Sequence, residues 1–229
     1  MSFLRSLLYT LLFYAGSTPI VVIGALISLV WPPAIQRTAR MWSDYVWWLT
    51  HNILRIKVVI RGVVPQHAVI VAAKHQSAFE TMATLHIWDN PAVAMKAELM
   101  RFPVWGYLAR RHGSIPVDRD ASTRAMREMM RASEAAIAQG RPIIIFPEGT
   151  RMAVGEAPPL KPGVAGIYRL VKLPVVPVAL DAGKLWPAGR FTKHPGTITL
   201  YIGEEIPAGL KRDELLSRLH AAINRDPTA

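Results

Sequence analysis

An uncharged apolar segment near the start of the sequence limits most strongly what this chain can fold into. Between Arg5 and Arg37 there is no Asp, Glu, Lys or Arg. A helix through the whole segment would be about 45 Å long, which is enough to cross a bilayer. However, the sequence AGSTP at residues 15–19 interrupts the run, because Pro19 disfavours helical geometry at the residue before it. The pattern therefore predicts one of two structures: a single kinked transmembrane helix, or a hairpin of two helices that enters one leaflet.

Aromatic and basic side chains follow this segment, as they do where a chain leaves a membrane. Four of the seven tryptophans gather beside Tyr45, namely Trp31, Trp42, Trp47 and Trp48. Such a cluster is typical of the aromatic belt at a membrane interface, although a buried aromatic core would give the same pattern. Arg37 and Arg40 would keep their side of a spanning segment in the cytoplasm. A cleaved signal peptide is disfavoured, because the run is long and no A-x-A site ends it. We expect residues 1–56 to form a membrane-anchoring helical segment.

The chain is basic and free of cysteine. Lys and Arg number 27 against 16 Asp and Glu, a formal charge of +11. This charge favours anionic partners such as nucleic acid, anionic lipid, or acidic carrier and cofactor molecules. The absence of cysteine excludes disulfides, thiolate zinc sites and a cysteine nucleophile. P-loop, dinucleotide-binding and serine-hydrolase motifs are absent, as are closely spaced histidine ligands and nucleic-acid-binding modules. We therefore expect no cofactor, no metal and no nucleic-acid partner.

From about residue 57, short β-rich runs alternate with helical stretches. Strands are predicted at residues 57–62, 67–74, 92–96, 114–118, 142–147, 174–180 and 197–203. The spacing of apolar residues predicts helices at 98–113, 121–140 and 212–225. Strands that alternate with helices are typical of an α/β fold with a mostly parallel sheet flanked by helices. Residues 57–229 are therefore expected to form one α/β domain, the candidate catalytic domain.

Polar residues follow three of the predicted strands, at the point where each strand ends. KHQSAFE follows VIVAA, DRD follows SIPV, and PEGTR follows IIIF. In open α/β sheets, ligands bind at the carboxyl ends of the strands. These three loops are therefore the predicted functional site. In the last of them, a glycine-containing turn with Arg151 suits a phosphate or another oxyanion.

His75 and Glu80 can be read in two ways. On a continuous helix, residues five apart lie about 140° apart around the axis and do not face each other. They can meet only if His75 precedes the helix, and SAFE at 77–80 has the pattern of a capping box that begins at Ser77. The pair is then either an acid–base pair or only a helix cap in which Glu80 accepts from the Ser77 backbone.

Four motifs in order resemble the 1-acylglycerol-3-phosphate acyltransferase family of membrane glycerolipid enzymes. They are HQSAFE, GSIPVDR, FPEGTR and VVPVAL, within residues 57–205. One departure is Glu80, which stands where the family more often has Asp. The resemblance implies transfer of a fatty acyl group from acyl-CoA or acyl-carrier protein to the sn-2 hydroxyl of 1-acylglycerol-3-phosphate (lysophosphatidate), giving phosphatidic acid for phospholipid biosynthesis. The implied partners are this membrane lipid, the donor thioester and the bilayer.

The resemblance also implies roles for individual residues. His75 would be the general base and Glu80 would orient its ring. The implied substrate-binding residues are Lys96, Gly113, Arg119, Glu148, Gly149, Thr150, Arg151 and Pro177. The implied location is the bacterial inner membrane, with the catalytic domain on the cytoplasmic side. Two alternatives stay open: an O-acyltransferase for another lysolipid such as lyso-ornithine lipid, and a non-catalytic membrane protein that binds anionic lipid.

Overall fold

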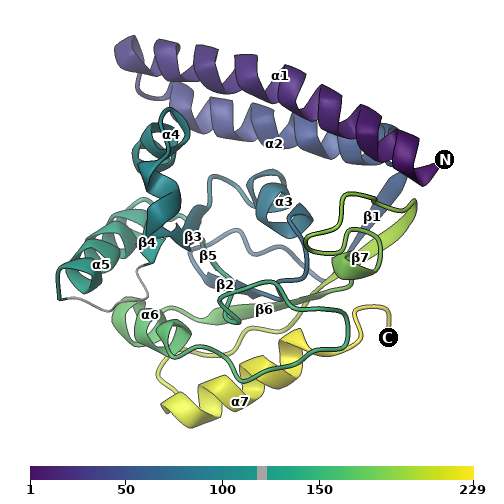
Figure 1. Cartoon of the computed structure of the whole chain (residues 1–229). Helices are drawn as coiled ribbons and strands as arrows, with labels where there is room; N and C mark the ends of the chain where they lie inside the picture. The colour runs from purple at the N-terminus through teal and green to yellow at the C-terminus, as the bar shows by residue number, and fades with distance from the viewer. Residues whose placement is uncertain (118–122) are drawn as a thin grey trace.

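The computed structural model describes residues 1–117 and 123–229, and it contains a seven-stranded sheet flanked by helices (Figure 1). The strands are β1 (Ile56–Arg61), β2 (Ile70–Ala73), β3 (Ala92–Lys96), β4 (Ile115–Val117), β5 (Ile143–Ile145), β6 (Val175–Leu180) and β7 (Gly196–Ile202). Their order across the sheet is β1-β7-β6-β2-β5-β3-β4. Each of the predicted β-rich runs forms one of these strands. All neighbouring pairs in this order are parallel except β6 and β7, which confirms the mostly parallel α/β sheet.

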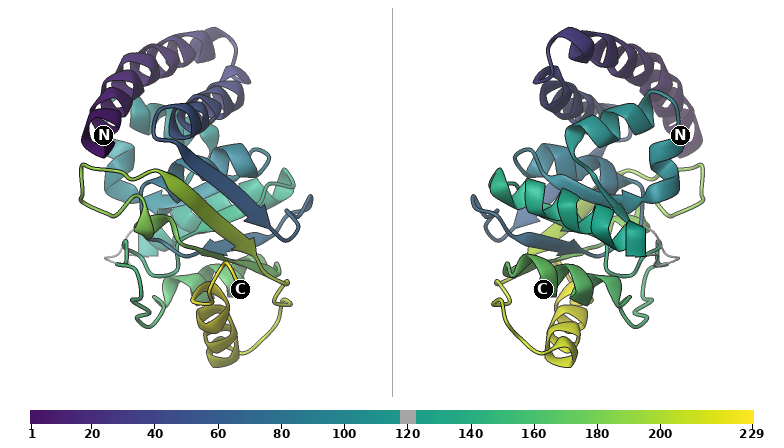
Figure 2. Two further views of the ribbon diagram at one scale, coloured as in Figure 1. Left: turned by 90° about the vertical axis from the view of Figure 1, so that its right-hand side faces the viewer. Right: turned by 90° about the vertical axis from the view of Figure 1, so that its left-hand side faces the viewer.

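Helices cover both faces of this sheet (Figure 2). They are α1 (Ser2–Val30), α2 (Ala34–Asn52), α3 (Phe79–Ile87), α4 (Trp105–His112), α5 (Thr123–Ala138), α6 (Gly163–Val171) and α7 (Arg212–Ile223), with short 3₁₀ helices η1 (Ala97–Arg101) and η2 (Ala182–Lys184). Strand β2 shows why both faces need cover. Val71 and Ala73 pack with α2 and α3, whereas Ile70 and Ala72 pack with α6 and α7. A strand that is apolar on both faces must be buried on both.

The helix predicted at residues 98–113 is divided in two. Helix η1 ends at Arg101, Phe102 is extended with φ −65° and ψ 133°, and α4 begins at Trp105. The cause is Pro103, because a residue that precedes proline is pushed out of the helical region. By contrast, helices α5 and α7 lie where the apolar spacing predicts them.

The expected interruption at residues 15–19 is wrong. Helix α1 continues through Pro19, and the chain reverses at Pro32 and Pro33 before α2. Packing against α2 explains why the helix continues, because Pro19 lies on the exposed side while small residues face α2. A Cβ on Gly24 would lie 2.3 Å from the Thr38 side chain, so the two helices approach too closely for a larger residue there.

Hydrogen bonds join the two antiparallel helices at residues 12 and 17 of α1. Trp42 donates its indole N–H to Ser17 Oγ at 3.0 Å, and the Tyr45 hydroxyl donates to the Leu12 carbonyl at 2.6 Å. A helical hairpin is therefore present, but its arms are α1 and α2 and not the two halves of the apolar run. Among the described helices, α1 alone is long and apolar enough to cross a membrane.

Candidate active site

The candidate site lies at the carboxyl ends of three neighbouring strands, β6, β2 and β5. Residues 74–78 follow β2, residues 146–151 follow β5, and η2 follows β6. The three segments are in contact: the Gly183 N–H donates to Gln76 Oε1 at 3.1 Å, and the Met152 N–H donates to the His75 carbonyl at 2.7 Å. Parallel pairing of the strands therefore brings the predicted KHQSAFE and PEGTR loops together.

His75 and Glu80 meet as the predicted turn at Ser77 requires. His75 Nδ1 lies 2.8 Å from Glu80 Oε1. The same oxygen accepts the backbone N–H groups of Gln76 and Ser77, both at 2.6 Å. Ser77 Oγ completes the cap by accepting the Phe79 N–H at 2.9 Å. Helix α3 begins at Phe79 with Ala78 as its N-cap, one residue later than the predicted cap at Ser77. Glu80 nevertheless binds the backbone turn before the helix and the imidazole with one atom.

This arrangement determines which nitrogen of His75 carries a proton. Glu80 Oε1 already accepts from two backbone N–H groups, so it is the acceptor in the contact with His75. His75 Nδ1 must then donate, which leaves a lone pair on Nε2 in the neutral ring. The His75 side chain is 14% exposed, whereas that of Glu80 is only 2% exposed. A partly exposed imidazole with a buried carboxylate behind the ring can act as a general base.

The loop after β5 holds His75 in place from a second side. The Phe146 ring stacks on the imidazole with centroids 4.3 Å apart. Glu148 Oε2 accepts the His75 backbone N–H at 2.7 Å. Both contacts come from the FPEGTR motif, so this motif positions the candidate base as well as forming a turn.

A buried lysine completes this support. Lys74 Nζ donates to Glu148 Oε1 at 2.7 Å, to Asn224 Oδ1 at 2.6 Å and to the Glu156 carbonyl at 2.6 Å. Lys74 and Glu148 are both almost fully buried. The predicted substrate contact of Glu148 is therefore not available in this arrangement, since both of its oxygens accept from the protein. No sequence motif singles out Lys74 or Asn224 as functional. Only the burial of Lys74 at the end of an apolar strand could have suggested that it has a charged partner.

The rest of the PEGTR turn is open to solvent. Gly149 has φ +73°, in the left-handed region that favours glycine, and a Cβ there would lie 3.0 Å from the Lys161 side chain. Thr150 and Arg151 are exposed, and within the described parts of the chain no ion pair engages Arg151. Arg151 directly precedes Met152, whose N–H is hydrogen-bonded to the His75 carbonyl, so the backbone of Arg151 lies next to the His75 loop.

The other residues predicted to bind substrate lie in different parts of the fold. Lys96 ends β3, is half exposed and pairs with Glu98 at 3.0 Å. Pro177 lies inside β6, where its carbonyl accepts the Gly203 N–H at 2.9 Å. Gly113 ends α4 in the left-handed conformation, two residues before β4 begins. It therefore lies near the amino end of a strand, whereas His75 follows the carboxyl end of β2. Arg119 and the DRD loop lie outside the described residues.

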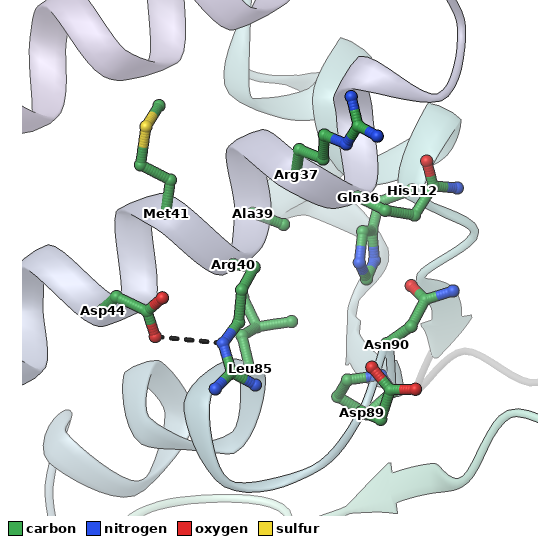
Figure 3. A pocket seen from close by; sticks show the side chains of 11 residues that line it. Gln36, Arg37, Ala39, Arg40, Met41, Asp44, Leu85, Asp89, Asn90 and His112 are labelled. Carbon is green, nitrogen blue, oxygen red and sulfur yellow. Dashed lines mark ion pairs between the residues drawn. The ribbon is translucent and has the colours of Figure 1, made fainter.

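Two surface cavities lie away from His75. One has a volume of about 480 Å³ and is lined by residues of α2, the end of α3 and His112, with the Arg40–Asp44 ion pair at its wall (Figure 3). The other, of about 770 Å³, lies among η1, α4 and α5. Neither is lined by the loops that carry the predicted acid–base pair. Across residues 1–117 and 123–229, no three His, Asp or Glu side chains gather as metal ligands.

Replacing Glu148 by Gln tests the support beneath His75. Lys74 would keep a buried charge without an anion, so the free energy of unfolding should fall by about 3–5 kcal/mol, measured by thermal unfolding. The double variant Lys74→Met/Glu148→Gln removes both charges and should recover more than half of the loss. Glu214→Gln breaks a half-exposed pair with Arg218 and serves as the matched control, with an expected loss of about 0.5 kcal/mol or less. Equal losses in the single and the double variant would contradict this account.

His112 predicts a pH dependence of stability. Burial, and secondarily the charge of Arg141, lowers its pKa to about 4. The unfolded chain binds this proton more readily, so the contribution to stability is complete above pH 6.5 and is lost as the pH falls toward 4. Between pH 7 and pH 5 the loss should be about 2 kcal/mol. Urea unfolding of His112→Gln should show a pH dependence smaller by that amount, whereas His51→Gln, at an exposed position in α2, should match the unmodified protein. A pH dependence that His112→Gln leaves unchanged would refute the assignment.

Known proteins resemble this chain in sequence and in fold. Residues 55–181 match the family model described as Acyltransferase. A 1-acyl-sn-glycerol-3-phosphate acyltransferase of Pseudomonas aeruginosa is 28% identical over 207 residues, covering 87% of this chain and 80% of that protein. One of Chlamydomonas reinhardtii is 24% identical over 194 residues, covering 82% of this chain but 58% of that protein.

A solved structure has the same fold. The crystal structure of the 1-acyl-sn-glycerophosphate (LPA) acyltransferase PlsC from Thermotoga maritima matches with a TM-score of 0.78 at 24% identity, covering 100% of this chain and 97% of that one. The family model spans more than half of the present chain and includes His75, Glu80 and the PEGTR turn. The chain therefore belongs to the acyltransferase family, and the resemblance of its motifs to the 1-acylglycerol-3-phosphate acyltransferases is confirmed.

Proposed function

We propose that this acyltransferase moves a fatty acyl group from an acyl thioester to the sn-2 hydroxyl of 1-acylglycerol-3-phosphate, which gives phosphatidic acid for phospholipid synthesis. The observation that carries the proposal is the contact of His75 Nδ1 with Glu80 Oε1 at 2.8 Å, which leaves Nε2 as the basic atom. The exposed Arg151, whose neighbour Met152 is hydrogen-bonded to the His75 backbone, supplies the cation that a phosphate-bearing acceptor needs.

The reaction then follows from these groups. His75 Nε2 takes the proton of the acceptor hydroxyl while the hydroxyl oxygen attacks the thioester carbonyl. Glu80 stabilises the imidazolium that forms. The carbon–sulfur bond breaks as the tetrahedral intermediate collapses, and the thiolate takes the proton from the imidazolium. The products are the new ester and a free thiol, and no covalent enzyme intermediate is needed.

We propose the following contacts for the acceptor phosphate. Arg151 binds it with its planar fork, and Lys96 contributes a second charge from the end of the neighbouring β3. Gly149 and Thr150 shape the turn that presents Arg151, and Arg119 is proposed from the motif alone. Glu148 and Pro177 support the loops and the strand, and contact no substrate. The donor is acyl-CoA or acyl-carrier protein, both of which are anionic and suit a chain of charge +11.

We also propose that residues 1–56 attach the catalytic domain, residues 57–229, to the cytoplasmic side of the bacterial inner membrane. The outward side of α1 is apolar and exposed along the whole helix. Its inner side belongs to the folded domain: Tyr9 is buried against Trp186, and Ser6 Oγ accepts the Lys193 N–H at 2.8 Å. Because α2 lies along α1 and contacts α3 and β1, we place the hairpin in one leaflet rather than across the bilayer.

The decisive experiment is an acyl-transfer assay with the purified full chain in lipid vesicles. Lysophosphatidate is offered with acyl-CoA and, separately, with acyl-carrier protein, and product is followed by released thiol, to which a cysteine-free chain adds no background. His75→Asn keeps a donor for Glu80 but removes the base, so the rate should fall about 100-fold or more. His51→Ala is the matched control and should retain full activity.

The same assay separates the alternatives. Lyso-ornithine lipid has no phosphate, so it should be acylated more slowly than lysophosphatidate. A faster rate with lyso-ornithine lipid would replace the proposed acceptor. Normal transfer by His75→Asn would remove His75 as the base, and no transfer by the unmodified chain with either donor would favour a lipid-binding protein.

A further inference from the structure

The catalytic domain exposes a group of large apolar side chains beside the helical hairpin. The group lies in the seven residues 99–105, which run from η1 to the start of α4. The exposed fractions there are 41% for Leu99, 57% for Phe102, 41% for Val104 and 36% for Trp105. Other exposed large apolar residues after α2 stand singly in the sequence, such as Val154 and Phe191, or as the pair Ile60 and Val63. Grouped apolar exposure of this kind marks an interaction surface, whereas single exposed residues need no explanation.

The fold holds this segment, residues 99–105, in a fixed shape. Met100 is buried and its carbonyl accepts from Arg110 Nη1, while the Gly106 N–H donates to the Phe102 carbonyl at 2.8 Å. Val104 has φ +57°, which is an outlier for a β-branched residue. Residues persist in such conformations only where their surroundings impose them, and they gather at functional positions. Phe102 and Val104 are therefore exposed on a turn whose conformation is fixed by the surrounding fold.

This turn is continuous with the surface of the hairpin. The Trp105 ring packs on Trp42 of α2 with centroids 5.5 Å apart, and Tyr107 Oη lies 3.4 Å from Ser28 Oγ of α1. Figure 1 shows α4 beside the turn between α1 and α2. On that half of α1, Val22, Ile23, Leu26, Ile27, Leu29 and Val30 are exposed. The exposed apolar residues of α1 and of the 99–105 segment therefore lie on parts of the fold that are in contact.

The charges around the 99–105 segment select its partner. From Leu99 to Val117 the sequence contains Arg101, Arg110 and Arg111 and no acidic residue, and Glu98 just before this range pairs with Lys96. Arg101 and Arg111 are exposed. Apolar side chains flanked by arginines suit a membrane surface with anionic headgroups, where the arginines lie at headgroup level. A second copy of this chain, with its own charge of +11, would bring like charges together.

We infer that the 99–105 segment is a second membrane contact, which inserts Leu99, Phe102 and Val104 into the same leaflet as α1. The segment follows shortly after Lys96, at the carboxyl end of β3. Its insertion would therefore hold the carboxyl ends of the strands, where the candidate site lies, against the lipid surface. This consequence for substrate access rests on the proposed function. The insertion itself rests on the proposed membrane attachment of α1 but not on the proposed acyl transfer.

The absence of cysteine makes the test direct, because a single introduced cysteine can carry one spin label. Four full-length variants are reconstituted in phosphatidylcholine vesicles with and without phosphatidylglycerol: Phe102→Cys, Leu99→Cys, Leu26→Cys and Val63→Cys. Accessibility to oxygen, which partitions into lipid, is compared with accessibility to a water-soluble nickel chelate. Val63 is 83% exposed and follows β1, so it is the matched control for an apolar residue in water.

We expect a ratio of oxygen to nickel accessibility severalfold higher at residues 99 and 102 than at 63, and close to that at 26. Phosphatidylglycerol should increase the difference. Ratios at both 99 and 102 equal to that at 63, with residue 26 in lipid, would overturn the second contact but leave the membrane attachment of α1. Water-like ratios at all four positions would overturn both, whatever the enzymatic activity. Spin–spin broadening at residue 102 that disappears on dilution with unlabelled protein would assign the surface to a second copy and overturn the proposal.

Discussion

One carboxylate oxygen organises the candidate site. Glu80 Oε1 accepts hydrogen bonds from His75 Nδ1 and from the backbone N–H groups of Gln76 and Ser77. A buried carboxylate is stable only when such donors replace the water that it has lost. The turn before α3 and the orientation of the imidazole therefore depend on the same carboxylate oxygen. The second oxygen of Glu80 is buried and has no partner among the described residues, so the whole demand for donors falls on Oε1.

The backbone of the same turn depends on a second buried charge. Glu148 links the His75 N–H to Lys74, and Lys74 reaches Asn224 just beyond α7. The strands β2 and β5 are adjacent, so their carboxyl ends bring these groups within hydrogen-bonding distance. The fold thus supports His75 from three elements: the first turn of α3, the loop after β5 and the end of α7. The exposed apolar residues of α1 and of the 99–105 segment would hold this site at lipid.

The sequence predicts the parts of this structure that depend on local pattern. Runs of β-branched residues correctly predict the strands, and the capping pattern at Ser77 predicts the turn between residues 75 and 80. Tertiary packing decides the rest. Pro19 does not end α1 because α2 stabilises the helix, and the network of Lys74 joins residues 150 positions apart. No local pattern reports such a partner. Helix α6 (Gly163–Val171) contains two glycines, which lower the helix propensity of its sequence. Burial of its apolar residues in the core stabilises the helix.

The central claim is that Glu80 holds His75 with Nδ1 protonated and Nε2 free. Nitrogen NMR of the ¹⁵N-histidine-labelled protein at neutral pH, with His75→Asn used to assign the signal, measures this tautomer directly. We expect the neutral form of the His75 ring to carry its proton on Nδ1, and we expect that single tautomer to be lost in Glu80→Ala. A proton on Nε2 in the unmodified protein, or a tautomer that Glu80→Ala leaves unchanged, would contradict it.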